Sequence, residues 1–304
     1  MGRPEGELAG RLRRRLRGKV ESHVPLARQT SFGVGGPARV VVSPADEADL
    51  LECLNLAASE GMPVLILGAG SNTLIRDGGF PGMVIRPDAF RMLERQGERI
   101  TAGAGVRISR LLAFGAKQGL SGLEILTGVP GTVGGAVWGN AGAWGGAVGD
   151  RVVTVRIVRA AEGTMELPRA AIPFRYRASG LPAGAVITRA TFGLVPGEGG
   201  DVRRCISAYL VQRSRKQPVE YRSAGSIFKN PPGDYAGRLV EAAGLKGSRI
   251  GNAQISEKHG NFIVNLGGAR AADILALVEL AKRRVREAAG VELELEMQVV
   301  GEDT

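Results

Sequence analysis

The stretch LTGVPGTVGGAVWGNAGAWGG, residues 126 to 146, holds eight glycines between Gly128 and Gly146. Glycine has no Cβ atom, so it adopts positive φ angles easily and lets the backbone approach a ligand closely. At this density, consecutive backbone N–H groups can point at one anion. We therefore expect a loop that binds an anionic group of a ligand.

Two further glycine clusters precede it, TSFGVGGPA (30 to 38) and LGAGSNTLIRDGGF (67 to 80). Gly68 and Gly70 match the first two glycines of the dinucleotide-binding fingerprint, but the third is missing. The residues that follow, TLIRDGG, predict a strand and a turn instead of the helix that a Rossmann site needs. A single G-x-G is most often a plain strand-to-loop turn. Three clusters in one half of the chain favour an extended diphosphate ligand held by loops.

The composition is that of a globular protein with two or three packed units: 304 residues, 44% hydrophobic and 23% charged. Cys53 and Cys205 fit no metal spacing, and we expect buried free thiols in a reducing compartment. The N-terminus lacks the apolar core of a signal peptide, and no stretch is long enough to cross a bilayer. The sequence predicts a cytoplasmic protein without a membrane span.

The chain carries a formal charge of +10, and its strongest basic cluster is RLRRRLRGK, residues 11 to 19. This cluster could contact nucleic acid, or it could form a short amphipathic helix with a solvated outer face. Few aromatic residues accompany it for base stacking, so we favour the helix and expect no nucleic-acid partner. The positive balance is compatible with an enzyme that handles phosphorylated ligands.

Helices and strands alternate along the chain without strict βαβ order, which predicts an α+β protein. One helix is expected from Ser43, as its cap, to Gly61, and another from about Ala271 to Ala289. The last segment, VELELEMQVV (291 to 300), alternates like a strand with its glutamates on one face. The turn-rich VPGEGGD (195 to 201) predicts a domain joint.

The glycine clusters closely resemble the FAD-binding half of the UDP-N-acetylenolpyruvoylglucosamine reductase family of bacterial peptidoglycan synthesis. Four later motifs resemble the substrate half of that family: FRYRAS (174 to 179), GSIFKNP (225 to 231), AQISEKHGNFIVN (253 to 265) and LELEMQVVGE (293 to 302). These motifs occur in the family's order from about Thr30 to Gly301.

The resemblance implies an FAD-binding domain of vanillyl-alcohol-oxidase type, with two α+β subdomains, followed by a C-terminal α+β substrate-binding domain. We expect a basic N-terminal helical segment at 1–22, the FAD-binding domain at 23–198 and the substrate-binding domain at 199–304. The glycine clusters contain neither histidine nor cysteine, so FAD should be bound noncovalently. The residues implied to bind it are Gly68, Ala69, Gly70, Ser71, Asn72, Thr127, Gly131 and Thr132.

The family's reaction uses NADPH to reduce the flavin, which then reduces the enolpyruvyl ether of UDP-N-acetylglucosamine. The resemblance implies that NADPH and the sugar nucleotide share one site. By motif match, Ser226 would donate a proton to the α carbon and Arg177 would polarise the enolpyruvyl group. The family pattern Leu-Glu-Pro-Glu-Val reads Leu-Glu-Leu-Glu-Met here, and aligning on VVGE selects Glu296 as the third catalytic residue. A carboxylate that assists protonation would need a modestly raised pKa.

On the substrate side, the resemblance implies four binding residues: Lys216, Arg213, Asn230 and Gln254. His259 could be structural or could face the ligand. The chain lacks the tyrosine-bearing insertion of some family members and offers only Tyr235 in that region, and we expect a monomer. Two other hypotheses stay open at this point: a different FAD-dependent oxidase or dehydrogenase of the same fold acting on a small alcohol or hydroxy acid, and a basic nucleic-acid-binding protein.

Overall fold

The computed structural model describes residues 5 to 304, and the chain divides into two compact units that are each assembled from separate stretches. Unit 1 contains the chain up to His23, Arg39–Ala69 and Gly82–Val211. Unit 2 contains Val24–Ala38, Gly70–Pro81 and Gln212–Thr304. Two glycine-rich segments of the N-terminal half therefore pack with the C-terminal residues. The expected domain boundaries at 22 and 198 stay a prediction, because compact packing alone does not define a folding domain.

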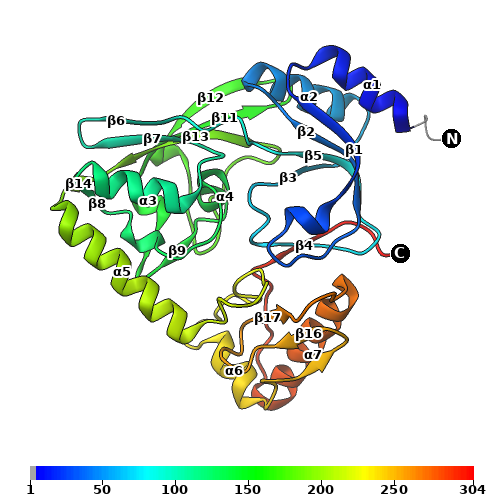
Figure 1. Ribbon diagram of the computed structural model, residues 1–304, viewed down its shortest axis with the longest axis vertical. Coiled ribbons are helices and arrows are strands. Elements are labelled where there is room, and N and C mark those ends of the chain that lie inside the picture. Colours follow the sequence, from blue (N-terminus) through cyan, green and yellow to red (C-terminus); the bar gives the residue numbers. More distant parts are fainter. Residues whose placement is uncertain (1–4) are drawn as a thin grey trace. The chain divides into compact units, whose positions relative to one another are not determined.

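A four-stranded sheet with the order β1-β2-β5-β3 lies mainly in unit 1. β3 and β5 run parallel. The helices α1 and α2 lie beside this sheet (Figure 1), and they share with it a hydrophobic core that includes Leu12, Leu50 and Met83. The bounds are α1 Glu5–Arg15, β1 Lys19–Pro25, β2 Pro37–Ser43, α2 Glu47–Ser59, β3 Val64–Ile66 and β5 Phe80–Ile85.

The rest of unit 1 is built on a five-stranded antiparallel sheet with the order β12-β11-β13-β7-β6. The helices α3 and α4 contribute to its core, which includes Ile100, Val137 and Phe192. Two short antiparallel pairs, a hairpin of β9 with β10 and a long-range pair of β8 with β14, complete it. The bounds are β6 Leu93–Gln96, β7 Arg99–Gly103, α3 Ile108–Lys117, β8 Leu120–Ser121, α4 Val133–Trp138, β9 Gly142–Ala143, β10 Gly146–Ala147, β11 Val152–Arg159, β12 Gly163–Pro168, β13 Val186–Gly193 and β14 Val195–Pro196.

Unit 2 combines a three-stranded antiparallel sheet, β15-β16-β17, with the helices α6 and α7 and with a parallel pair, β4 and β18. Its core includes Leu74, Ile227 and Ile274. The chain passes from unit 1 to unit 2 within α5, after Val211. The bounds are β4 Thr73–Ile75, α5 Gly199–Lys216, α6 Ala236–Ala242, β15 Arg249–Ile250, β16 Ala253–Ile255, β17 Ile263–Asn265, α7 Ala271–Ala289 and β18 Gln298–Val300.

Two element predictions need correction. The α2 cap is Asp46, whose carboxylate accepts hydrogen bonds from the N–H groups of Ala48 and Asp49, and not Ser43. Ser43 cannot serve because it is the last residue of β2. The predicted strand at 291 to 300 is also wrong in length, since only Gln298–Val300 forms a strand, which pairs with the equally short β4, and Leu295 adds one isolated bridge.

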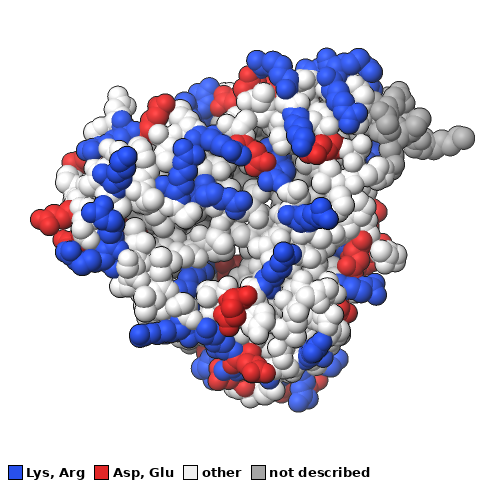
Figure 2. All heavy atoms as spheres, in the orientation of Figure 1, with Lys and Arg blue, Asp and Glu red and all other residues white. Residues whose placement is uncertain are grey.

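The basic cluster at residues 11 to 19 is largely engaged in contacts within unit 1. Arg11 forms an ion pair with Glu60, and Arg15 Nη1 lies 2.9 Å from Glu52 Oε1 on α2. Lys and Arg side chains are spread over the face shown in Figure 2, with Asp and Glu among them. These pairs support the amphipathic-helix interpretation of this cluster.

Both cysteines of the chain are free thiols. Cys53 is buried in α2, and burial raises the pKa of its thiol to about 12. Cys205, on α5, is only half-buried, so the expectation of a buried thiol is wrong for it. None of the helices between residues 5 and 304 is both long enough and apolar enough to cross a bilayer.

Candidate functional site

The loop that leaves β3 presents a row of backbone donors. Leu67 N–H still bonds to the Ile85 carbonyl oxygen at 2.9 Å, and the chain then turns through Gly68, Ala69 and Gly70. Within the described chain, the N–H groups of these three residues have no acceptor. Gly70 has a φ of +60°, and a Cβ atom there would lie 2.3 Å from the Gln29 carbonyl oxygen. Only glycine fits this turn.

Thr132 lies opposite this loop within unit 1. A Cβ atom on Gly68 would lie 2.6 Å from Thr132 Oγ1, so the two residues face each other with no room for a larger side chain. The Thr132 residue is 6% exposed, and its hydroxyl has no hydrogen-bond partner among the described residues. A buried hydroxyl without a partner costs roughly 1–3 kcal/mol, which indicates a ligand atom at this position.

Two other predicted residues of this region lie on the segment that leads to Thr132. Thr127 is fully buried, and its carbonyl oxygen accepts a hydrogen bond of 3.2 Å from Trp144 Nε1. Gly131 has a φ of +137°, which only glycine adopts readily. The donors collected here, backbone N–H groups and a hydroxyl, are those that a diphosphate accepts. The residues present therefore fit the diphosphate of FAD.

Arg177 occupies a tight turn in unit 1. Arg175 and Ala178 pair across the turn, and Arg177 itself has a φ of 57°, which is unusual for a residue other than glycine. Its Nη1 donates to the Gly142 carbonyl oxygen at 3.1 Å, and its guanidinium stacks over the Tyr176 ring at 5.1 Å. A buried asparagine, Asn140, holds the same turn by donating to the Arg175 carbonyl oxygen at 2.8 Å. The strained turn thus fixes the backbone position from which the Arg177 side chain extends.

The residues around Ser226 and Glu296 lie side by side in unit 2. Phe228 pairs with Leu295 in an antiparallel bridge. The Glu296 N–H donates to the Ile227 carbonyl oxygen at 2.9 Å, and the Lys229 N–H donates to the Glu294 carbonyl oxygen at 2.8 Å. Ser226, one residue before Ile227, is half-buried. The structure therefore brings together the chain segments of two of the three predicted catalytic residues.

Glu296 differs from the two glutamates that precede it. The side chains of Glu292 and Glu294 are 68% and 76% exposed, whereas Glu296 is half-buried. The strand on which the three glutamates were expected to share a face does not form at residues 291 to 297. Glu296 is thereby separated from the solvated pair and lies against the residues that follow Ser226.

A predicted FAD-side residue, Asn72, lies in unit 2 and contacts the Glu296 segment. Its Nδ2 donates to the Glu296 carbonyl oxygen at 3.1 Å, and its own carbonyl oxygen accepts from the Gln298 N–H at 3.0 Å. β4 and β18 begin directly after these contacts, pairing Thr73 with Gln298. The loop that begins at Gly68 therefore ends beside Glu296.

The four predicted substrate residues are dispersed within unit 2. Lys216 is exposed at the end of α5, and burial lowers the pKa of Arg213 one turn earlier. Asn230 Oδ1 accepts from the Ala236 N–H at 3.1 Å, at the start of α6. Gln254 Nε2, on β16, donates to the Gly247 carbonyl oxygen at 3.1 Å.

Asn261 was not among the predicted site residues, although it lies within the motif AQISEKHGNFIVN. It is 3% exposed and bonds through its side chain to Phe228, close to Ser226. A polar residue directly before the apolar run FIV was the available signal. His259 Nδ1 accepts a hydrogen bond from the Asn261 N–H at 3.1 Å, and burial lowers the pKa of His259.

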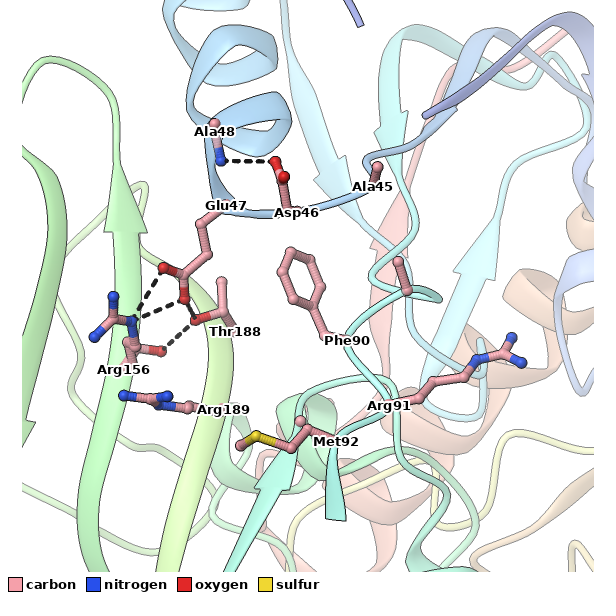
Figure 3. Close-up of a pocket in the computed structure, with 12 residues that line it drawn as sticks. Ala45, Asp46, Glu47, Ala48, Phe90, Arg91, Met92, Arg156, Thr188 and Arg189 are labelled. Atoms are coloured by element: carbon pink, nitrogen blue, oxygen red, sulfur yellow. Dashed lines mark hydrogen bonds and ion pairs between the residues drawn. The ribbon is translucent and has the colours of Figure 1, made fainter. Parts of the chain in front are cut away.

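A separate pocket in unit 1 contains none of the predicted residues (Figure 3). Its lining includes Glu47, Arg156 and Thr188. Glu47 accepts from Arg156 Nε at 2.9 Å and from Thr188 Oγ1 at 2.6 Å. Burial opposes ionisation of Glu47, but these hydrogen bonds outweigh it and lower its pKa. Glu47, Arg156 and Thr188 thus form a hydrogen-bonded group within the pocket. No cluster of metal-ligating side chains occurs in residues 5 to 304.

Comparison with known proteins relates these features to a family. The profile of an FAD binding domain matches residues 38–167, and that of the C-terminal domain of UDP-N-acetylenolpyruvoylglucosamine reductase matches residues 217–300. A UDP-N-acetylenolpyruvoylglucosamine reductase of Anaeromyxobacter sp. (strain Fw109-5) is 45% identical, covering 99% of this chain and 95% of that protein. One of Geobacter sulfurreducens is 46% identical, covering 97% of this chain and 99% of that protein.

The solved structures agree with the sequence relatives. The crystal structure of UDP-N-acetylenolpyruvylglucosamine reductase from Thermus caldophilus matches with a TM-score of 0.81 and 38% identity, covering 93% of this chain and 99% of that chain. This likeness and the two profile matches confirm the predicted α+β fold, with an FAD-binding domain followed by a C-terminal substrate-binding domain. The chain therefore belongs to the UDP-N-acetylenolpyruvoylglucosamine reductase family.

Proposed function

We propose that the chain reduces the enolpyruvyl ether of UDP-N-acetylglucosamine to UDP-N-acetylmuramate, with NADPH as the reductant and FAD as a noncovalent cofactor. The observation that carries the proposal is the hydrogen bond of 2.9 Å from Glu296 N–H to the carbonyl oxygen of Ile227, the residue after Ser226. It places a hydroxyl and a carboxylate on adjoining segments of a chain that belongs to this reductase family.

The residues that would hold the FAD diphosphate are the donors of the β3 loop and of the segment before α4. In unit 1 these are Gly68, Ala69, Thr127, Gly131 and Thr132; the loop continues through Gly70, Ser71 and Asn72. The chemistry that FAD supplies when bound is transfer of reducing equivalents from NADPH to the terminal carbon of the enolpyruvyl group. The three glycine clusters contain no histidine or cysteine that could link the flavin covalently.

Ser226 has the role of proton donor. Reduction at the terminal carbon leaves negative charge on the α carbon and the carboxylate of the substrate. The Ser226 O–H bond then breaks, a C–H bond forms with the electron pair of the α carbon, and the serine oxygen regains a proton from solvent. A serine in this role must stay protonated until the charge develops. It therefore needs no base beside it, unlike a nucleophilic serine.

Glu296 and Arg177 assist the same step from different parts of the molecule. Glu296 lies on the segment that pairs with the residues after Ser226, where its carboxylate assists proton transfer. Arg177 pairs with the substrate carboxylate and draws charge away from the α carbon. Its guanidinium stays charged at all relevant pH values and can form two parallel hydrogen bonds to a carboxylate.

The remaining substrate contacts are assigned to unit 2. Lys216 and Arg213, on α5, are cations suited to the substrate phosphates or carboxylate. Asn230 and Gln254 contribute amide groups toward the uridine-diphosphate sugar. In this proposal NADPH and the sugar nucleotide occupy the same site in turn.

The cellular role follows from the reaction. UDP-N-acetylmuramate is a peptidoglycan precursor, so the enzyme would act in the cytoplasm and support cell-wall biogenesis, cell shape and cell division. We propose a monomer with the domain boundaries 1–22, 23–198 and 199–304, without a nucleic-acid partner.

An absorbance experiment tests the proposed function. The purified protein should show flavin bands, NADPH should bleach them, and the enolpyruvyl sugar nucleotide should restore them. A small alcohol or hydroxy acid in place of NADPH should leave the oxidised flavin unreduced. A colourless protein that takes up no FAD, or reduced flavin that the sugar nucleotide does not re-oxidise, would contradict the proposal.

A further inference from the structure

Asn261 holds the chain directly after Ser226 through three hydrogen bonds. Its Oδ1 accepts from the Phe228 N–H at 2.9 Å, and its Nδ2 donates to the Phe228 carbonyl oxygen at 2.8 Å. Its main-chain carbonyl oxygen accepts from the Ile227 N–H at 3.0 Å. Because Asn261 is 3% exposed, water does not compete for these bonds. The side-chain amide of Asn261 thus bonds to both the N–H and the carbonyl oxygen of Phe228, as the backbone of a neighbouring strand would.

The opposite edge of the same segment belongs to Glu296. Ile227 donates its N–H to the Asn261 carbonyl oxygen, while its own carbonyl oxygen accepts the N–H of Glu296. Gly225, on the other side of Ser226, has a φ of 74° and turns the chain just before the serine. Ser226 thus lies between a turn and a segment that is held on both edges, so its position relative to Glu296 depends on Asn261.

The side-chain chemistry needed at this position is specific. An asparagine offers one acceptor and two donors on a short stem, and both types are used on a single residue, Phe228. Alanine would remove both side-chain bonds, and aspartate would keep the size of the side chain and Oδ1 but lose the Nδ2 donor. A loss at either atom would leave a buried main-chain group of Phe228 unsatisfied.

We propose that Asn261 is a positioning residue that fixes Ser226 relative to Glu296 for protonation of the substrate α carbon. This inference rests on the proposed function. In this role Asn261 contacts neither substrate nor cofactor. An error in the placement of a reacting group of about 1 Å can cost about 10²-fold in rate, so loosening this segment should slow the protonation step more than it lowers stability.

The test compares the two half-reactions in Asn261→Ala by stopped-flow absorbance. Flavin reduction by NADPH should keep its rate, while re-oxidation by the enolpyruvyl sugar nucleotide should slow by about 10-fold to 10²-fold. Hydrogen exchange at the Phe228 amide should become faster, because its acceptor is lost. Asn261→Asp keeps the acceptor of the Phe228 N–H but loses the Nδ2 donor, so it should slow re-oxidation without speeding exchange at that amide, and it replaces the alanine variant should that protein fail to bind FAD.

Asn265→Ala is the matched control. Asn265 is also buried and bonds through its side chain to the Phe32 carbonyl oxygen and the N–H groups of Gly267 and Ala269. It should lower thermal stability about as much as Asn261→Ala without selectively slowing re-oxidation. Equal slowing of both half-reactions in Asn261→Ala, or equal selective slowing in Asn265→Ala, would overturn the inference.

A double-mutant cycle separates the inference from the proposed function. If Asn261 acts through Ser226, adding Asn261→Ala to Ser226→Ala should cause no further slowing of re-oxidation. An additive loss would overturn the role of Asn261 while leaving that of Ser226 intact. Unchanged re-oxidation in Ser226→Ala alone would overturn the proton-donor role and the inference with it.

Discussion

The loop at Gly68 and the segment after Ser226 differ in how their polar groups are hydrogen-bonded. In the loop, the N–H groups of three successive residues and the buried hydroxyl of Thr132 have no partner among the described residues. In the segment from Ile227 to Lys229, main-chain groups are bonded on one edge to Asn261 and on the other to residues 294 to 297. The loop therefore has hydrogen-bond donors without acceptors among the described residues, whereas the segment after Ser226 is hydrogen-bonded to other residues of the protein.

The difference separates binding from positioning. Open donors in a half-buried loop and a buried hydroxyl without a partner cost free energy unless a ligand accepts from them, so they indicate where an anionic cofactor binds. A residue that must transfer a proton needs a fixed position instead, which a fully bonded backbone provides. We therefore expect changes in the glycine loop to alter the affinity for FAD. Changes in the segment after Ser226 should alter the rate of substrate reduction.

A large effect, second only to that of Ser226→Ala, is expected for Glu296→Gln. Its N–H and carbonyl oxygen, which bond to Ile227 and Asn72, are main-chain groups that the substitution leaves in place. Only the carboxylate is lost, so re-oxidation of the reduced flavin by the sugar nucleotide should slow by about 10²-fold. Single-turnover kinetics measures this rate.

The neighbouring variant Glu294→Gln is the control for this prediction. Glu294 is exposed, and its carboxylate lies 3.2 Å from Lys229 Nζ. Exposed ion pairs contribute little, so re-oxidation should keep its rate. A loss of FAD affinity in Glu296→Gln with normal re-oxidation would break the comparison, since the carboxylate would then belong to the binding region.

A smaller effect of opposite character is expected for Thr132→Val. Removing a buried hydroxyl that has no partner should raise the free energy of unfolding of the FAD-free protein by about 1 kcal/mol. The same change should weaken FAD binding by about 10-fold, because a donor to the diphosphate is lost. Thermal unfolding and flavin titration measure the two quantities.

Thr188→Val makes the same substitution at a hydroxyl that is bonded, to Glu47 at 2.6 Å. It should lower stability and leave FAD affinity unchanged. If Thr132→Val instead destabilises the FAD-free protein as Thr188→Val does, the open-donor interpretation of the loop is incorrect.

The smallest effect is expected for Glu47→Gln, which lies in neither region. Burial raises the pKa of Glu47, but hydrogen bonds from Arg156 and Thr188 outweigh it, so the folded-state pKa lies below the usual 4.5. Its contribution is therefore complete above about pH 4.5 and is lost as the pH falls through the folded-state pKa. The variant should be less stable by about 1 kcal/mol at pH 7.

Thermal unfolding across pH measures this difference, which should shrink below pH 4.5. Both half-reactions should keep their rates at pH 7. A stability difference that grows toward acid pH would contradict the assigned direction of the pKa shift.

Local sequence patterns predicted some elements closely and others poorly. The apolar stripe of α7 predicted a helix from Ala271 to Ala289, and these are its bounds. Residues 291 to 297 show an equally regular alternation, yet they form no strand. Strand length depends on the partner, and β4, which pairs with β18, is only three residues long. The periodicity of a segment indicates which secondary structure it prefers, but not which strand it pairs with or over how many residues.

The candidate site divides in the same way. The glycine loop was predictable because positive φ and close approach demand glycine within a few consecutive residues. Ser226 and Glu296 came from motif resemblance, and their adjacency required the bridge between Phe228 and Leu295. Asn261 was not predicted because its role depends entirely on its contact with Phe228, which lies more than thirty positions away in the sequence.

Stopped-flow analysis of Ser226→Ala tests the central claim most directly. Ser226 makes the proton available, whereas FAD is bound by the glycine loop, so the two half-reactions should separate. We predict that the variant binds FAD and is reduced by NADPH at the normal rate, and that its re-oxidation by the enolpyruvyl sugar nucleotide falls by about 10³-fold or more. Normal re-oxidation, or an equal loss of both half-reactions in a folded variant that retains FAD, would contradict the account.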